Sequence, residues 1–189
     1  MTAAGRRPVE VHGYALVSNN DCIAAADGVT PPTLRNAKDW EYYQNAQAHS
    51  ALVVFGRRSH EFEPNVRGEA RLVVSRTAAG LEQRADGWWW DPAQVGWPEV
   101  AARLLPGGGE VAAGGGQGLF DLFLAIGFDA FHLSRARHVT LPGGLPIFSA
   151  CGAGVTADQV LTNAGLRVGE HLPLDPEAGV EMDVWRRPR

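Results

Sequence analysis

Three short apolar runs constrain the fold of this 189-residue chain more than any other feature. They lie at residues 51–55, 71–75 and 110–113, and their apolar parts are continuous rather than alternating. A parallel strand with helices over both faces is buried on both sides, and it therefore shows this pattern. A segment with helical spacing, residues 97–105, separates the last two runs. The sequence predicts a parallel-rich sheet covered on both faces and joined by right-handed crossovers.

Further elements of the same kind fill the rest of the chain. We predict strands at residues 9–18 and 129–134, a short helix after Gly56, and longer helices at residues 36–48 and 117–126. The predicted fold class is α/β, with a central mostly parallel sheet, an antiparallel C-terminal edge and helices on both faces.

The C-terminal part has a different pattern. Residues 160–168 and 180–186 look extended, and we expect them to form the antiparallel pair at the sheet edge. We expect a single domain over residues 1–189, with residues 1–8 flexible, because one core usually serves a chain of this length.

Composition argues against several classes of function. The formal net charge of −4 gives the chain no general attraction for nucleic acid. No apolar run approaches the roughly 18–20 residues that span a bilayer, and the first residues lack the apolar stretch of a secretory signal. We therefore expect a cytoplasmic protein. Cys22 and Cys151 form no Cys-x-x-Cys pattern and the histidines no His-x-x-x-His pattern, which argues against a disulfide framework and a metal site.

Glycine and polar residues follow each of the three apolar runs. The segments are Gly56-Arg57-Arg58-Ser59, Ser75-Arg76-Thr77 and Gly114-Gly115-Gly116-Gln117. In open α/β sheets, ligands bind outside the carboxyl ends of the strands, where these segments would meet. The sequence therefore predicts one ligand site built from three turns. The alternative is that each segment is only a tight turn.

The residue types in these turns suit a phosphorylated dinucleotide. Backbone N–H groups at a helix start attract phosphate, and Arg57 and Arg58 add positive charge. Hydroxyls and a guanidinium at residues 75–77 suit a 2′-phosphate, which favours NADPH over NADH. The glycines at residues 114–116 let the backbone approach a ligand without obstruction by a Cβ atom.

The order and spacing of these motifs resemble the dihydrofolate reductase family over about residues 11–148. The segments that carry the resemblance are residues 56–61, 72–76 and 113–117, the last directly before the predicted helix at 117–126. The resemblance implies a dihydrofolate reductase-like fold, NADPH as cofactor and hydride transfer to a pterin.

The resemblance and the turns together assign residues to both ligands. The expected cofactor-binding residues are Ala15, Ile23, Gly56, Arg57, Arg58, Ser59, Ser75, Arg76, Thr77, Gly114, Gly115, Gly116, Gln117, Gly118 and Leu119. The resemblance also implies a cis peptide bond between Gly115 and Gly116. The expected substrate-binding residues are Tyr14, Asp39, Tyr43, Phe120 and Phe123.

Asp39 and Ser134 are the expected catalytic residues. Asp39 matches, with one residue inserted before the next strand, a helix carboxylate that faces the amino-pyrimidine edge of the pterin. Such a carboxylate accepts two hydrogen bonds and favours protonation of the ring nitrogen next to the carbon that receives hydride. Ser134 matches a hydroxyl residue that supports this carboxylate. The alternatives are a solvated Asp39 stabilised by the helix dipole, and plain core packing for Tyr43 and Phe123.

The chain departs from the family pattern at several positions. The loop at residues 24–32 lacks the expected tryptophan, and Phe120 replaces a tyrosine. Glu69 falls where an arginine pairs with the glutamate tail of folate, and its carboxylate would repel that tail unless Arg67 or Arg71 compensates. This mismatch favours a dihydropterin with another tail, such as dihydromethanopterin.

Two other functions remain open. Residues 127–129 and 141–148 resemble the reductase domain of the riboflavin pathway, whose substrate is a ribosylated aminopyrimidine. A nucleotide-binding relative that has lost catalysis is the second alternative. The three tryptophans at residues 88–90 are expected to pack at an edge strand or in a homodimer contact rather than on nucleic acid bases.

Overall fold

The computed structural model describes residues 7–188 and contains one large and one small sheet. The large sheet has the strand order β10-β11-β8-β1-β7-β3-β4-β6-β5. Its strands are β1 (Val9–Ser18), β3 (Leu52–Gly56), β4 (Arg71–Val74), β5 (Leu81–Arg84), β6 (Gly87–Trp90), β7 (Gly109–Gly114), β8 (Ala130–Ala136), β10 (Arg167–Asp175) and β11 (Val180–Arg186). The small sheet pairs β2 (Cys22–Ala24) with β9 (Leu145–Pro146).

Five α-helices and one 3₁₀ helix belong to the described part of the chain. They are η1 (Pro32–Leu34), α1 (Ala37–His49), α2 (Arg57–Phe62), α3 (Trp97–Leu104), α4 (Gln117–Ile126) and α5 (Ala157–Asn163). The predicted flexibility of residues 1–8 lies, for residues 1–6, outside the described residues.

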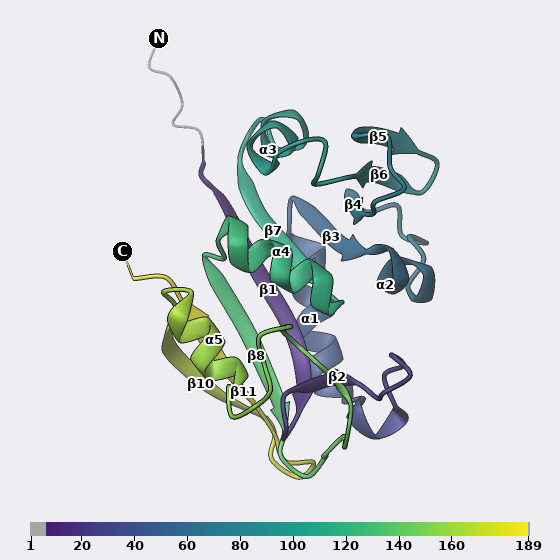
Figure 1. Cartoon of the computed structure of the whole chain (residues 1–189). Helices are drawn as coiled ribbons and strands as arrows, with labels where there is room; N and C mark the ends of the chain where they lie inside the picture. Colours follow the sequence, from purple (N-terminus) through teal and green to yellow (C-terminus); the bar gives the residue numbers. More distant parts are fainter. Residues whose placement is uncertain (1–6, 189) are drawn as a thin grey trace.

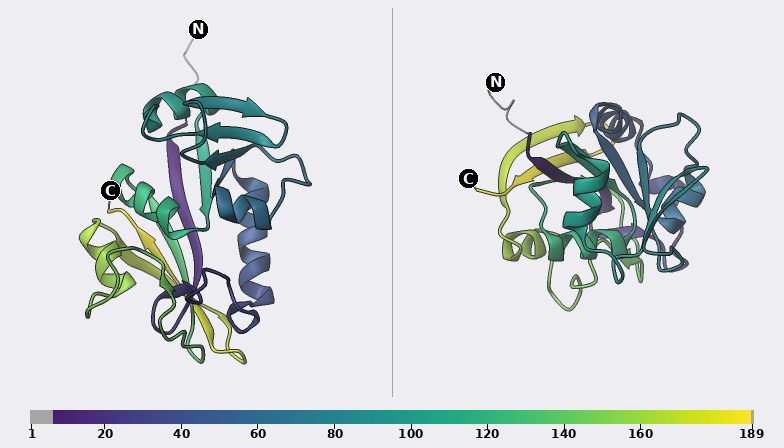
Figure 2. Two further views of the ribbon diagram at one scale, coloured as in Figure 1. Left: turned by 45° about the vertical axis from the view of Figure 1, so that its right-hand side comes forward. Right: turned by 90° about the horizontal axis from the view of Figure 1, so that it is seen from above.

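The centre of the large sheet is parallel and its two edges are antiparallel. β1 pairs in parallel with β7 and β8, and β3 pairs in parallel with β7 and β4. β11 is antiparallel to β8 and β10, and β5 is antiparallel to β6. Helices α4 and α5 cover one face and α1 covers the other (Figure 1), and the turned views in Figure 2 agree. The predicted fold class, including its antiparallel C-terminal edge, is therefore confirmed.

Aromatic rings fill the core between the sheet and α4. Phe120 of α4 contacts Phe131 of β8 edge to face at a centroid distance of 5.4 Å, and Phe123 lies 5.9 Å from Phe128. All four rings are at most 1% exposed. Burial of a side chain of this size stabilises a fold by about 1.5–3 kcal/mol. This packing fixes α4 on the sheet and so fixes the glycine turn that precedes it.

The prediction of an extended segment at residues 160–168 is wrong for most of its length. Helix α5 covers its first part, and β10 begins only at Arg167. The helix starts with a capping box in which the side chains of Thr156 and Gln159 each accept a hydrogen bond from the other's backbone N–H. Val160 and Leu161, which belong to this helix, are buried. The capping residues and the helical spacing of the buried side chains outweigh the extended preference of a short apolar run.

The three tryptophans lie in β6, one strand inside the β5 edge of the sheet. Trp90 is 1% exposed, and its indole Nε1 donates to the carbonyl oxygen of Val95 at 2.8 Å. The guanidinium of Arg84, on the edge strand β5, lies over the ring of Trp89 at 4.0 Å. Packing near the sheet edge therefore accounts for these rings.

Three further observations concern residues 7–188. No helix there is long and apolar enough to cross a membrane. No three His, Cys, Asp or Glu side chains in this range are grouped so that they could hold a metal ion. Cys22 and Cys151 are both free thiols.

Candidate active site

The three polar turns lie at one edge of the sheet. In the register of the parallel strands, Gly56 at the end of β3 is level with Val74 of β4, the residue before Ser75. Val54 of β3 is level with Ala113 of β7, the residue before Gly114. A Cβ atom on Gly56 would lie 3.7 Å from the carbonyl oxygen of Gly115, which is ordinary contact. Strand register thus brings together segments that are far apart in the sequence.

The glycine turn before α4 is tightly packed against α2. Gly115 and Gly116 have φ angles of 93° and 89°, which side chains disfavour. A Cβ atom on Gly115 would lie 2.7 Å from the hydroxyl oxygen of Ser59. The described residues contain no cis peptide bond, so the cis bond that the resemblance implied between Gly115 and Gly116 is wrong; positive φ angles at both glycines reverse the chain instead.

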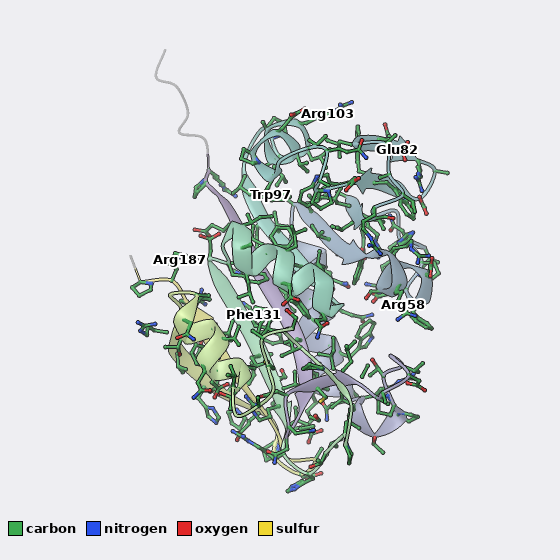
Figure 3. All side chains as sticks on the ribbon, in the orientation of Figure 1. Arg58, Glu82, Trp97, Arg103, Phe131 and Arg187 are labelled. Atoms are coloured by element: carbon green, nitrogen blue, oxygen red, sulfur yellow. The ribbon has the colours of Figure 1, made fainter. Side chains whose placement is uncertain are left out.

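The arginines around these turns have different surroundings. Arg57 Nη1 donates to Glu61 Oε1 at 2.7 Å, so a carboxylate already accompanies that charge. Arg58 is exposed and reaches toward the loop after β2, where a Cβ atom on Gly28 would lie 3.2 Å from its Nη1 (Figure 3). Arg76, at the end of β4, is also exposed. Arg58 and Arg76 are therefore better placed than Arg57 to meet an anion from solution.

The hydroxyls after β4 bond to one another. Ser75 Oγ lies 2.8 Å from Thr77 Oγ1 and accepts from the backbone N–H of Thr77 at 3.2 Å. Ser75 is buried and Thr77 is exposed. Ser75 thus shapes the turn, while Thr77 presents its hydroxyl to solvent beside Arg76.

The first residues of α4 have three different environments. Gln117 Nε2 donates to the carbonyl oxygen of Pro146 in β9 at 2.9 Å, which ties the helix start to the small sheet. A Cβ atom on Gly118 would meet nothing within 4 Å. The Leu119 side chain is 3% exposed and belongs to the core, so only its backbone remains available to a ligand.

Phe120 and Phe123 pack in the core on the α4 face of the sheet. Phe120 contacts Phe131 and Phe148, and Phe123 contacts Trp97 edge to face at 5.2 Å. Their predicted contact with substrate finds no support in these positions, because the rings lie on the face opposite α1. Ala15 and Ile23, expected beside the nicotinamide, are part-buried against the same core.

Helix α1 brings Asp39 to Ser134 on the other face. Asn36 caps the helix, its Oδ1 accepting from the backbone N–H groups of Lys38 and Asp39 at 3.0 Å each. Burial raises the pKa of Asp39 above its usual value, and the hydroxyl of Ser134 beside it lowers that pKa by a smaller amount. The two predicted catalytic residues therefore lie close together, while Ser134 Oγ forms no hydrogen bond with any of the described residues.

Tyr43 connects this carboxyl group to the glycine turn. It follows Asp39 by one helical turn, and its hydroxyl lies against Gly114, in the space that a Cβ atom there would fill. Burial raises the pKa of Tyr43 above its usual value. Tyr43 thus links the helix face that carries Asp39 to Gly114, and the next glycine of the turn, Gly115, contacts Ser59.

Tyr14 belongs to an aromatic cluster on the same face, and its ring centroid lies 5.6 Å from that of Tyr43. Its ring stacks on His132 with centroids 4.4 Å apart, and its hydroxyl donates to Glu110 Oε1 at 2.9 Å. Tyr42 Oη lies 3.0 Å from His132 Nδ1. Burial lowers the pKa of His132 to about 3, so this histidine is neutral near pH 7. The Tyr14 hydroxyl is thus already engaged within the protein, whatever its backbone contributes.

Asp21 and Arg135 are two residues near the site that sequence reasoning missed. The carboxylate of Asp21 accepts from the Arg135 guanidinium and from the backbone N–H of Ala157 at 2.9 Å. Arg135 also donates to Asp158 Oδ1 at 2.7 Å. This ion pair fixes the start of β2, the strand that carries Ile23. The signal was an arginine inside β8, a strand that is buried along its whole length, because a buried guanidinium requires a carboxylate partner.

Comparisons with known proteins were made by sequence and by structure. No protein-family model matches the sequence. No curated protein is significantly similar to it in sequence. Solved structures do match. Dihydrofolate reductase from Enterococcus faecalis, complexed with NADP(H) and RAB-propyl, has a TM-score of 0.67 at 13% identity and covers 95% of this chain and 97% of its own.

Two further solved structures match over most of this chain. A protein assigned to riboflavin biosynthesis from Shewanella sp. PV-4 has a TM-score of 0.62 at 16% identity, covering 96% of this chain and 100% of its own. A diaminohydroxyphosphoribosylaminopyrimidine deaminase/5-amino-6-(5-phosphoribosylamino)uracil reductase from Thermotoga maritima has a TM-score of 0.64 at 14% identity. The match covers 96% of this chain but 57% of that one. The protein therefore has the dihydrofolate reductase-like fold.

Proposed function

We propose that this protein is an NADPH-dependent reductase that transfers hydride to a reduced pterin. The observation that carries the proposal is the row of residues from Asp39 through Tyr43, whose hydroxyl lies against Gly114, to Ser59, which contacts Gly115. It joins a part-buried carboxyl group to a glycine turn at the carboxyl edge of a parallel sheet. Hydride transfer to a heterocycle requires that the dinucleotide site and the ring site adjoin, because the nicotinamide and the ring must lie in contact.

The residues at the sheet edge fit a phosphorylated dinucleotide. The part-buried glycines Gly115 and Gly116 lie directly before the ten-residue helix α4, whose first N–H groups favour an anion. The exposed Arg76 and Thr77 suit a 2′-phosphate, and Arg58 supplies further positive charge. Bound NADPH would supply the hydride; the protein binds and orients it.

In this proposal Asp39 binds the pterin. Its two oxygens can accept from the amino group and the ring N–H of an aminopyrimidine edge. Because burial raises its pKa, Asp39 takes up a proton more readily than an exposed aspartate. The carboxyl group thereby favours protonation of the ring.

Dihydrofolate itself fits the site poorly. Glu69 Oε2 accepts from Arg71 Nη2 at 3.0 Å, and Arg71 Nη1 donates to the carbonyl oxygen of Glu63. The guanidinium of Arg71 is therefore engaged within the protein, and of the two arginines that could compensate Glu69 only the exposed Arg67 remains for a glutamate tail. We propose a dihydropterin with another tail, dihydromethanopterin being one example.

A second candidate is reduction of a ribosylated aminopyrimidine. The reductase from Thermotoga maritima, which shares the fold at a TM-score of 0.64, favours it. In that reading Asp39 would not be needed to anchor a pterin, so the two candidates make opposite predictions for this residue.

Loss of NADPH absorbance in the presence of each substrate separates these candidates. Dihydrofolate, dihydromethanopterin and the aminopyrimidine of the riboflavin pathway are offered in parallel to wild type and to Asp39→Asn. Our proposal expects turnover of a dihydropterin by wild type, with loss of turnover but unchanged NADPH affinity in the variant. Turnover of the aminopyrimidine alone would support the second candidate. NADPH binding without any turnover would indicate a non-catalytic relative.

A further inference from the structure

A pocket of about 500 Å³ is lined by both free thiols of the chain. Its walls are the turn before β2, the residues around β9 and the loop before α5. Cys22, the first residue of β2, lies on one wall, and Cys151 lies on the wall formed by the loop. Neither thiol has a role in the proposed reaction, so their presence in one pocket has a separate explanation.

Backbone pairing brings the two cysteines to this pocket from distant parts of the sequence. Cys22 is opposite Pro146 in the small sheet, and Figure 1 shows the segment between β8 and α5 running beside β2. The chain then turns, and the N–H of Cys151 donates to the carbonyl oxygen of Phe148 at 3.0 Å. This turn carries Cys151 back to the pocket that Cys22 lines.

The two sulfur atoms are near enough to interact electrostatically. Burial is the largest cause of the raised pKa of each thiol, and the carboxylate of Asp21 raises both. Cys22 is itself one of the groups that raise the pKa of Cys151. The thiolate is the reactive form of cysteine, so these protonated thiols stay reduced until a disulfide reagent reaches the pocket.

The loop wall has room to move, whereas the β2 wall is packed. Gly152 and Gly154 have φ angles of 123° and 90°, and a Cβ atom on either would meet nothing within 4 Å. On the opposite wall, a Cβ atom on Gly144 would lie 3.0 Å from the Cβ atom of Cys22. A disulfide requires Cα atoms about 4.4–6.8 Å apart. The glycines therefore allow Cys151 to approach Cys22 while β2 keeps its place.

Unusual backbone conformations lie beside both cysteines. Within residues 7–188, the non-glycine residues with positive φ are Asp21, at 61°, and Ala153, at 50°. Asp21 directly precedes Cys22, and Ala153 follows Cys151 by two residues. Such conformations persist where the surroundings fix them, and they cluster at functional sites. Arg135 fixes the first of them by pairing with the Asp21 carboxylate.

The pocket also adjoins elements of the candidate active site. Strand β2 carries Ile23 and continues into the loop at residues 25–31. The carbonyl oxygen of Pro146 accepts from Gln117 Nε2 at the start of α4, at 2.9 Å. A covalent bond across the pocket would therefore restrain segments that border the proposed cofactor site.

We infer that Cys22 and Cys151 form a reversible disulfide in exchange with a small disulfide such as oxidised glutathione. The thiolate of the more exposed Cys151 attacks one sulfur of that disulfide and releases one glutathione thiolate. The Cys22 thiolate then attacks the Cys151 sulfur, forms the protein disulfide and releases the second glutathione thiolate. The two cysteines lose two protons and two electrons, and glutathione disulfide gains them as two thiols. The bond fixes the loop before α5 on β2, which restrains the loop at residues 25–31.

Incubation of the protein with graded ratios of reduced to oxidised glutathione tests this inference. The intact mass of wild type should fall by two hydrogen atoms, and peptide mapping should find one cross-linked peptide pair containing Cys22 and Cys151. Dithiothreitol should reverse both changes. Hydrogen exchange at residues 22–31 should be slower in the oxidised protein than in the reduced protein. Cys151→Ser is the matched control, because the same treatment cannot cross-link it and should not slow its exchange.

The peptide map of wild type decides the inference even if a variant folds poorly. Glutathione adducts without a cross-link, or thiols that stay reduced at every ratio, would overturn it. A cross-link that leaves exchange at residues 22–31 unchanged would overturn the restraint on the loop. None of these measurements uses NADPH or a pterin, so their outcome is separate from that of the proposed function.

Discussion

Ser59 of α2 and Gly115 of the turn before α4 are in such close contact that a Cβ atom on Gly115 would lie 2.7 Å from the Ser59 hydroxyl oxygen. This contact joins the turn after β3 to the turn after β7 and leaves no room for a side chain. Ser59 of α2 therefore supports the glycine turn, which is part-buried at Gly115 and Gly116.

Gly115→Ala should weaken both the fold and nucleotide binding. The φ angle of 93° and the contact with Ser59 make a side chain costly here, by about 1–3 kcal/mol. We expect a lower free energy of unfolding in urea titration and at least tenfold weaker NADPH binding in calorimetry. Gly107→Ala is the control, because a Cβ atom there would meet nothing within 4 Å. Equal behaviour of the two variants would contradict this account of the turn.

Arg76→Ala should reduce NADPH affinity about tenfold and leave NADH affinity nearly unchanged. The exposed guanidinium of Arg76 is expected to meet the 2′-phosphate, which NADH lacks. Arg57→Ala should have a smaller effect, because Glu61 already pairs with that arginine at 2.7 Å. Calorimetric titration with both nucleotides checks this. A similar loss for NADPH and NADH would show that Arg76 does not read the 2′-phosphate.

Asp39→Asn should stabilise the protein at neutral pH while it abolishes turnover. Burial raises the folded-state pKa of Asp39 above the ordinary value of 3.8, so the protonated carboxyl group is favoured in the folded state. Its stabilising effect is present below the unfolded pKa and is lost as pH rises through the folded pKa. Melting temperatures of wild type and variant should therefore agree near pH 3 and diverge above the raised pKa, with the variant higher. A variant less stable than wild type at pH 7 would contradict the inferred cost of burying this carboxylate.

Asp21→Asn should destabilise the fold by about 3 kcal/mol, because it breaks a buried ion pair and leaves Arg135 poorly compensated. Asp21 and Arg135 are 8% and 7% exposed. Glu82→Gln, which breaks the more exposed pair with Arg84, should cost much less, because solvent screens an exposed ion pair. Urea unfolding of both variants measures the difference. If the two costs were equal, the Asp21–Arg135 pair would not be the support of β2 that its position indicates.

The larger elements could be predicted from the sequence because their determinants are local. Strand β1 spans Val9–Ser18 and helix α4 spans Gln117–Ile126, the same residues that the sequence predicts. Asn36 caps α1 as its residue type indicates. Parallel register then brings the three polar turns to one edge, so this part of the candidate site also follows from sequence order.

The rest depended on contacts that no local pattern contains. Strand β2 exists because Cys22 pairs with Pro146, far away in the sequence. The direction in which the ring of Phe123 points depends on how α4 rotates against the sheet. The pair of Arg57 and Glu61 is a local contact four residues apart on α2, but the sequence predicted this helix without defining its last residue and so did not predict the pair.

Transfer of deuterium from NADPH labelled at the transferable position of the nicotinamide tests the central claim most directly. The labelled cofactor is incubated with the protein and a dihydropterin in ordinary water, and the product is examined by mass spectrometry. Our account predicts a tetrahydropterin that carries one deuterium from the cofactor, with none formed by Asp39→Asn. A tetrahydropterin without the label, or no reduction despite bound NADPH, would contradict it.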